Sequence, residues 1–277
     1  MTERQQHRRR HGAGVAAGVL CVCLTGSGCA KDGAAADSRG RDSVEVVRRA
    51  ADTLVGAQSA KARTSMEMAT GGTRVTIRGE GVYDFGKQLG RLKVLLPQDP
   101  AGATAHRPIM ELLAPGALYM KNRGAGVPAN KWVRVDTRSL SDGNLVTGGA
   151  TDPFAAAEVL RGARTATYVG QEDIAGTSVR HYRGTADLGF AAQGASDGHR
   201  ESLAAAAKGF ATEQVPFDVY LDEAGRIRKV RHRFSFVNGQ QSDAVAVAST
   251  TLLYDFGAPV DVRLPDGDDI YAGKIAE

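Results

Sequence analysis

From Arg74 to Phe85 the sequence alternates between two kinds of position, and this run limits the fold more than any other feature. Its odd positions carry apolar or small residues, namely Val75, Ile77, Gly79, Gly81, Tyr83 and Phe85. Its even positions are mostly polar, namely Arg74, Thr76, Arg78, Glu80, Val82 and Asp84. A period of two is typical of a strand with one buried and one solvated face, as in an antiparallel sheet.

Similar apolar or alternating runs recur along the chain and predict about ten strands in hairpin order. They fall at residues 92–96, 118–120, 131–136, 166–170, 177–188, 215–222, 226–236 and 244–256. The sequence DEAG at 222–225 predicts a hairpin turn between two of these strands.

Two or three helices accompany the predicted strands. The first covers 42–60; it begins at Asp42, which forms a capping-box pattern with Glu45, and it carries apolar residues at 3.6-residue spacing. The second begins with Asp152 as N-cap and Pro153 at the first helical position, and a helical insertion covers roughly 196–210. We therefore expect an α+β fold, with one large twisted antiparallel sheet packed against the helices in a single domain over 42–277.

Residues 1–28 have the layout of a secretory signal peptide. Four arginines in the first ten residues precede an uncharged stretch of roughly 13 residues, which is too short to span a membrane. The sequence GSGC then resembles a bacterial lipobox, in which signal peptidase II cuts before a cysteine that carries diacylglycerol. Gly26 departs from that pattern, because an aliphatic residue is usual there. We predict that Cys29 is the lipid attachment site.

Two alternatives remain for the export of the chain. Ala34 and Ala36 form an A-x-A site before Asp37, and cleavage there would release a soluble secreted protein. The arginine run also fits a twin-arginine signal, although the absence of a following Phe-Leu pair favours the general secretory route.

Cysteine count and charge agree with a lipid anchor. Cys21 and Cys23 lie within the signal, so the mature chain keeps Cys29 alone and has neither an internal disulfide nor a cysteine-based metal site. The signal holds four arginines and one glutamate, so its removal lowers the net charge from +4 to about +1. The basic balance is therefore no indication of nucleic-acid binding. Residues 29–41 are small and polar, and we expect a flexible tether.

Four segments carry a resemblance to a known family. They are KWVRVDT at 131–137, the helix DPFAAAEVLRGA at 152–163, VGQEDIAGTSVRHYRGTADL at 169–188 and VPFDVYLDEAGRIRKVRHRFSF at 215–236. Over roughly 42–261 the chain resembles the LppX/LprG-type lipoproteins of mycobacteria and related actinobacteria, which are similar in fold to the LolA/LolB lipoprotein carriers. The resemblance implies a half-barrel sheet around helices, with an apolar cavity that holds an acylated lipid or glycolipid.

The inner sheet face is the candidate wall of such a cavity. Its predicted lining residues are Val75, Ile77, Gly79, Gly81, Leu92, Val94, Leu118, Met120, Phe217, Val219 and Leu221. The glycines either leave room for an acyl chain or permit a sharp bend of the sheet. The same apolar pattern is typical of a solid core, so both interpretations stay open.

No motif of the chain predicts an enzyme, a cofactor or a metal site. The four histidines of the mature chain lack metal-ligand spacing, and the two YDFG sequences at 83–86 and 254–257 lack every other kinase signature. In the basic run RIRKVRHR, Arg231 and Arg233 are expected on the solvated sheet face and His232 on the opposite face as a satisfied histidine.

Two hypotheses follow from the sequence. The first is a lipid-anchored, extracytoplasmic protein that binds an acylated lipid or glycolipid and transports or presents it in the cell envelope. The second is a non-enzymatic structural or interaction lipoprotein with a solid core, accessory to an envelope complex through a protein partner that the sequence does not identify.

Overall fold

The computed structural model of this chain describes residues 30–70, 73–97, 107–148, 150–237 and 244–273. One open sheet of eleven strands runs in the order β6-β5-β4-β3-β2-β1-β11-β10-β9-β8-β7. The strands are β1 (Ser59–Thr70), β2 (Thr73–Asp84), β3 (Leu89–Leu95), β4 (Ile109–Ala114), β5 (Ala117–Lys121), β6 (Val133–Asp136), β7 (Ala163–Ile174), β8 (Thr177–Asp187), β9 (Gln214–Leu221), β10 (Ile227–Val237) and β11 (Ala244–Tyr254). Every pair of neighbours is antiparallel.

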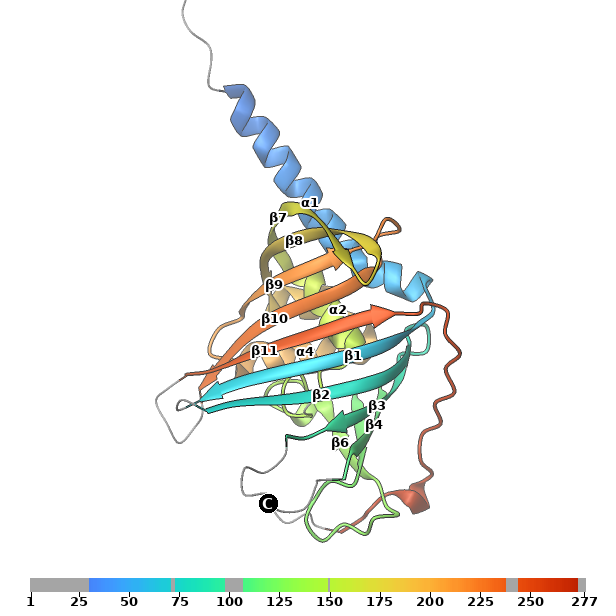
Figure 1. The fold of residues 1–277 in the computed structure, drawn as a ribbon. Helices are drawn as coiled ribbons and strands as arrows, with labels where there is room; N and C mark the ends of the chain where they lie inside the picture. Colours follow the sequence, from blue (N-terminus) through green and yellow to red (C-terminus); the bar gives the residue numbers. More distant parts are fainter. Residues whose placement is uncertain (1–29, 71–72, 98–106, 149, 238–243, 274–277) are drawn as a thin grey trace, which may run out of the picture.

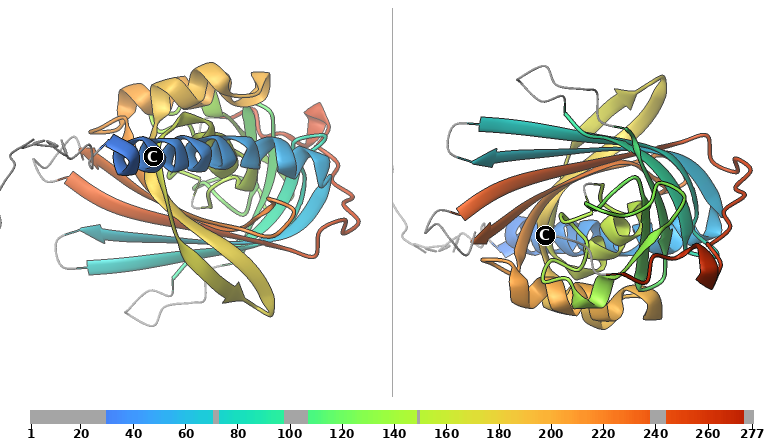
Figure 2. Two further views of the ribbon diagram at one scale, coloured as in Figure 1. Left: turned by 90° about the horizontal axis from the view of Figure 1, so that it is seen from above. Right: turned by 90° about the horizontal axis from the view of Figure 1, so that it is seen from below.

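Helices cover one side of this sheet. They are α1 (Ala30–Gly56), α2 (Pro153–Val159), α3 (Leu188–Gly194) and α4 (Asp197–Gly209), with short 3-10 turns η1 (Thr137–Ser139), η2 (Leu160–Gly162) and η3 (Gly267–Asp269). Figure 2 shows the sheet curving around α2, with α1, α3 and α4 on the same concave side. The strands β6 and β7 form the two edges of the sheet and do not pair with each other (Figure 1). The predicted α+β class and large curved antiparallel sheet are confirmed.

The N-terminal part of the fold differs from the prediction at both ends of the first helix. Helix α1 begins at Ala30 rather than Asp42, so it includes residues that we expected in a flexible tether. The run Ala34–Ala36 explains the extension, because alanine has the highest intrinsic helix propensity. The predicted signal peptide and Cys29 lie outside the described residues.

Strand β1 is absent from the sequence prediction, which placed its first residues in the helix. Its inward positions alternate as expected of a strand, but they carry the small or weakly apolar residues Ala60, Ala62 and Thr64 before Met66. The side chains at these inward positions are therefore hardly more apolar than those of the preceding helix, which also contains alanines. A backbone reversal at Gln58, whose φ is +65°, separates the two elements.

Local signals at α2 and at the β9–β10 turn behave as predicted. The Asp152 side chain accepts hydrogen bonds from the backbone N–H groups of Phe154 and Ala155, and Pro153 occupies the first turn. In the hairpin turn, Asp222 N–H donates to Arg226 O, and Gly225 N–H donates to Asp222 O. These contacts satisfy backbone groups that the ends of helices and strands leave free.

The core lies between the concave sheet face and the helices. Its largest aromatic group joins the end of β2 to α2, where Tyr83, Phe85 and Phe154 have ring centroids 5.2 to 6.3 Å apart. The first YDFG sequence therefore contributes two rings, Tyr83 and Phe85, to the core.

Candidate functional site

All eleven predicted lining residues face the concave side of the sheet. They lie on β2, β3, β5 and β9, and most of them belong to one buried apolar cluster with the helices. Val75 is half-buried against this cluster. The lining residues of β2 and β3 are neighbours in the sheet, whereas the β9 residues are separated from β2 by β1, β11 and β10.

The two glycines of β2 sit where another chain segment comes close. A Cβ atom added at Gly79 would lie 2.5 Å from Thr64 Oγ1 and 3.3 Å from the Cβ atom of Ala150. A Cβ atom at Gly81 would overlap the backbone of Arg91 on β3. Side-chain atoms beside Gly79 and backbone atoms beside Gly81 therefore occupy the space that a Cβ atom would need.

The interior around the predicted lining is densely occupied. Leu92, Val94 and Phe217 have no exposed surface, and the helices supply a matching layer of small and apolar residues. A cavity of about 20 Å³ lies between Asp152, His199 and Ser202 at the N-terminal ends of α2 and α4. This volume is enough for about one water molecule.

Four polar side chains on the concave face have buried atoms without a hydrogen-bond partner among the described residues. They are Thr64 on β1, Glu111 on β4, His232 on β10 and Thr251 on β11. Thr64 and Thr251 are directly opposite each other across the β1–β11 pair. His232 is opposite Ser249 on β11, and Ser249 lies two residues before Thr251. The central strands therefore carry a short polar row inside an apolar interior.

Glu111 is the most unusual member of this group. Its side chain is fully buried, neither carboxylate oxygen has a protein partner in the described part of the chain, and its cross-strand neighbours are Leu92 and Met120. Burial raises the pKa of Glu111 from 4.5 to about 8, since a low-dielectric interior disfavours the charged carboxylate. The sequence prediction has no strand at 109–114 and so did not place Glu111; a single glutamate within the apolar run IMELLA is the signal for it.

His232 corrects one prediction in part. It faces the interior as expected and lies 5.7 Å, centroid to centroid, from Phe234, but its Nε2 atom has no partner among the described residues. The expectation of a satisfied histidine was wrong in that respect. Burial lowers the pKa of His232 to about 3, so the imidazole is neutral at physiological pH.

The outward sheet face carries the charged residues. Asp218 on β9 accepts hydrogen bonds from His181, Arg183 and Arg233 at 2.8 to 2.9 Å, which confirms that Arg233 points outward. Burial raises the pKa of Asp218, but these three donors outweigh burial and hold its pKa at about 2. Arg231 also faces outward and lies 3.9 Å from Glu67.

One Ser–His–Asp arrangement occurs near α4 and requires an explanation. Ser196 Oγ lies 3.3 Å from His199 Nδ1, and His199 Nε2 lies 3.6 Å from Asp152 Oδ2. Asp152 is already engaged as the N-cap of α2 and accepts a hydrogen bond from Tyr83. The adjacent 20 Å³ cavity leaves no room for a substrate, so we interpret the arrangement as structural.

The described ranges contain neither a metal-ligand cluster nor a helix that could cross a bilayer. No group of three or more His, Cys, Asp or Glu side chains has metal-binding geometry there. Among the described helices, none combines the length and the apolar character needed to cross a bilayer.

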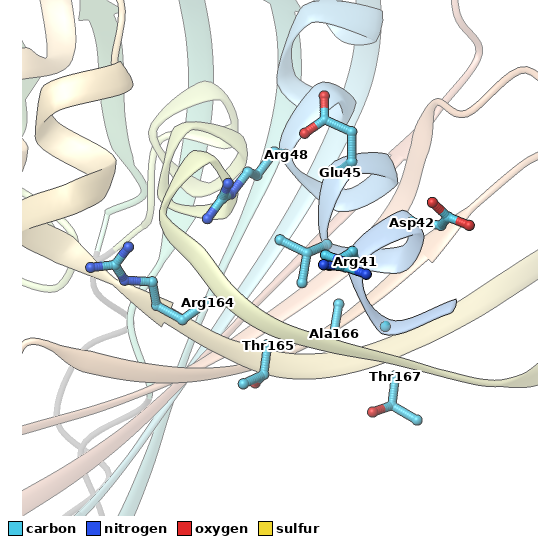
Figure 3. A pocket seen from close by; sticks show the side chains of 10 residues that line it. Arg41, Asp42, Glu45, Arg48, Arg164, Thr165, Ala166 and Thr167 are labelled. Carbon is cyan, nitrogen blue, oxygen red and sulfur yellow. The ribbon is translucent and has the colours of Figure 1, made fainter. Parts of the chain in front are cut away.

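An open pocket of about 760 Å³ lies between α1 and the edge strand β7 (Figure 3). Arg41, Asp42, Glu45 and Arg48 line it from the helix, and residues 164–167 line it from the strand. This pocket was not predicted, because its two sides are more than a hundred residues apart in the sequence.

Comparison with known proteins gives likeness in fold only. No family model and no curated protein matches the sequence. Lipoprotein LppX of Mycobacterium tuberculosis is 11% identical with a TM-score of 0.48, over 80% of this chain and 99% of that one. LprF from Mycobacterium bovis is 14% identical with a TM-score of 0.42, over 83% and 99%. A putative outer membrane lipoprotein-sorting protein domain from Vibrio parahaemolyticus is 10% identical with a TM-score of 0.33, over 80% and 94%. LppX-type lipoproteins are thus among the solved structures that this chain is similar to, as the sequence resemblance predicts.

Proposed function

We propose that this protein is a lipid-anchored protein of the cell envelope that binds an acylated lipid or glycolipid on the concave sheet face, for transport or presentation. The observation that carries the proposal is the polar row on that face, where Thr64, Thr251 and His232 have buried atoms without a described protein partner. An unpaired buried polar atom costs roughly 1–3 kcal/mol. The ester or hydroxyl groups of a bound lipid supply partners for such atoms, and its acyl chains match the surrounding apolar side chains.

The anchor and the location belong to the same proposal. Cys29 follows the lipobox-like sequence and is the single cysteine left after removal of the signal. A diacylglyceryl group at Cys29 supplies two acyl chains, which hold a protein stably at a membrane where one chain binds reversibly. The folded domain would then work at the extracytoplasmic face of the cell membrane.

A second function is favoured by the dense packing of the interior. Leu92, Val94 and Phe217 are fully buried against the helices, as in a solid core. A structural or interaction lipoprotein would need no ligand and would use its outer surface to bind a protein partner. The two functions differ in whether lipid travels with the purified protein.

Native mass spectrometry of the full-length protein, purified in detergent from an actinobacterial host, distinguishes them. A covalent anchor survives organic extraction, whereas a bound lipid leaves with the solvent. We expect an extractable adduct that fragments as an acylated lipid. A protein mass without such an adduct, unchanged after incubation with envelope lipids, would refute the lipid-binding proposal and favour the solid core.

The variant Thr251→Val tests the polar row directly, because it removes the unpaired hydroxyl and keeps the side-chain shape. With a lipid bonded to this hydroxyl, the variant retains clearly less lipid than the wild type. Without a ligand, the same change removes an unsatisfied group and raises the free energy of unfolding by about 1–3 kcal/mol. Thr250→Val on the outward face of the same strand is the matched control and leaves lipid content unchanged.

A further inference from the structure

The pocket between α1 and β7 contains two arginines whose charges no carboxylate neutralises within the described chain. Arg48 and Arg164 both stack on the Phe190 ring, with guanidinium carbons 4.9 and 4.2 Å from its centroid. Neither guanidinium has an acidic oxygen of the described residues within 4.0 Å. Two like charges against one ring repel each other, and a bound anion would relieve that repulsion.

Arg48 is held in place by the fold. Its Nε and Nη2 atoms donate to the carbonyl oxygen of Ala163 at 2.9 and 2.6 Å, just before the pocket-lining part of β7. The remaining N–H donors of its guanidinium are therefore presented in a fixed orientation. Arg164 follows Ala163 in the chain, so the same strand segment positions both arginines.

The acidic residues of the pocket do not cancel this charge. Glu45 forms an ion pair with Arg49 at 3.3 Å, outside the pocket lining. In Figure 3 the guanidinium groups of Arg48 and Arg164 point to one side of the pocket, whereas the carboxylate of Asp42 lies on the opposite side. With Arg41 included, three cations and two carboxylates line the pocket, which leaves a net charge of +1.

The neutral donors of the pocket come from the backbone of β7. Thr165 and Thr167 are among the lining residues, but in Figure 3 their side chains lie on the side of β7 away from α1. Strand β7 is an edge of the sheet, so alternate backbone N–H groups along it have no strand partner. Guanidinium groups and backbone N–H groups are donors that phosphate oxygens prefer in proteins, and arginine binds phosphate in a bidentate manner.

We propose that this pocket binds a phosphate group, with Arg48 and Arg164 as its principal ligands. The phosphate could belong to a phospholipid headgroup or to a soluble phosphorylated compound, since both present the same oxygens. The inference does not depend on lipid binding at the concave face, because the pocket lies at the sheet edge and shares no residue with the polar row.

Isothermal titration calorimetry of the full-length protein in a phosphate-free nonionic detergent tests the proposal. The probes are inorganic phosphate, dihexanoylphosphatidylglycerol and, as the control without a phosphate, dihexanoylglycerol. Saturable binding of phosphatidylglycerol together with weak binding of inorganic phosphate assigns a headgroup. Equal binding of both assigns a soluble phosphate, and both results support the site. Binding of neither phosphate nor phosphatidylglycerol at millimolar concentration overturns it, as does equal affinity for dihexanoylglycerol and phosphatidylglycerol.

Arg164→Glu is the decisive variant, because it places a carboxylate beside Arg48 and neutralises that arginine without a ligand. We expect it to weaken binding by about tenfold or more, with an unchanged circular-dichroism spectrum. Arg164→Lys keeps the charge but loses the bidentate geometry, so we expect an intermediate affinity.

Arg134→Glu is the matched control. Arg134 is an exposed arginine over the Tyr119 ring, at 6.0 Å, on the opposite edge strand of the sheet. Its replacement should leave the affinity unchanged. An unaltered affinity of Arg164→Glu, or an equal loss in Arg134→Glu, would overturn the assignment. Lipid adducts that persist in Arg164→Glu separate a failure of this site from a failure of the concave face.

Discussion

Replacing Glu111 by glutamine should change how the stability of this protein depends on pH. The Glu111 carboxyl is fully buried and has no partner in the described protein, and its pKa rises from 4.5 to about 8 in the folded state. Between these two pH values the folded chain keeps a proton that the unfolded chain has lost. The free energy of unfolding therefore falls as pH rises, by about 1.4 kcal/mol per pH unit.

The total loss follows from the same two values. The interval from 4.5 to about 8 corresponds to about 5 kcal/mol at about 1.4 kcal/mol per pKa unit. This amount is a large part of the 5–15 kcal/mol that stabilises a typical domain. In Glu111→Gln the side chain stays neutral in both states, so this pH-dependent loss disappears.

Urea unfolding measures the effect, with the fluorescence of the single tryptophan, Trp132, and circular dichroism as probes. We expect the difference in unfolding free energy between Glu111→Gln and wild type to be small at pH 5. By pH 8 the variant should be more stable by several kcal/mol, up to about 5. Glu80→Gln on the exposed face of β2 is the control and should give a flat difference. A flat difference for Glu111→Gln as well would refute the reasoning, because the folded carboxyl would then ionise normally.

Three further predictions concern stability. The pKa of Asp218 is held at about 2, so the stabilisation that Asp218 provides is present above its ordinary pKa of 3.8 and is lost as pH falls towards 2. In urea titrations, Asp218→Asn should therefore lower the free energy of unfolding by about 2 kcal/mol at pH 7 and by almost nothing at pH 2. The pKa of His232 is lowered to about 3, so between pH 6.5 and 3 the unfolded chain binds a proton that the folded chain does not. The free energy of unfolding should fall by up to about 5 kcal/mol over this range, and His232→Gln should remove this pH dependence. Phe154→Ala opens a cavity between β2 and α2, and calorimetry should show a loss of about 3–5 kcal/mol, whereas a loss below about 1 kcal/mol would contradict the packing described.

Sequence patterns predicted the elements whose signals are local. The alternation in β2, the Asp152 cap of α2 and the turn at 222–225 each depend on neighbouring residues, and the structure has all three. Strand β1 escaped prediction because its inward alanines carry little hydrophobic contrast. The early start of α1 was not predicted, because a short polar segment has the composition of a flexible tether, whereas its alanines have a high helix propensity.

The candidate site was only partly predictable for a different reason. The eleven predicted lining residues lie on one face of the sheet, whereas strand β4, which carries Glu111, was not among the predicted strands. Whether an inward atom finds a partner depends on segments distant in sequence, so the unpaired atoms of Thr64 and His232 had no local signal. The arginine pair over Phe190 joins α1, β7 and α3, and only the tertiary fold brings them together.

The open edges of the sheet determine how far the volume that it encloses can differ between related sequences. A closed barrel has a radius fixed by its strand number and stagger, so a larger content requires more strands. Here β6 and β7 do not pair, so no condition of barrel closure fixes the curvature of the sheet. Both α2 and α3, on the concave side, carry buried alanines. Under the proposed lipid-binding function, larger or smaller side chains at these positions would change the room for acyl chains while the strands stay the same.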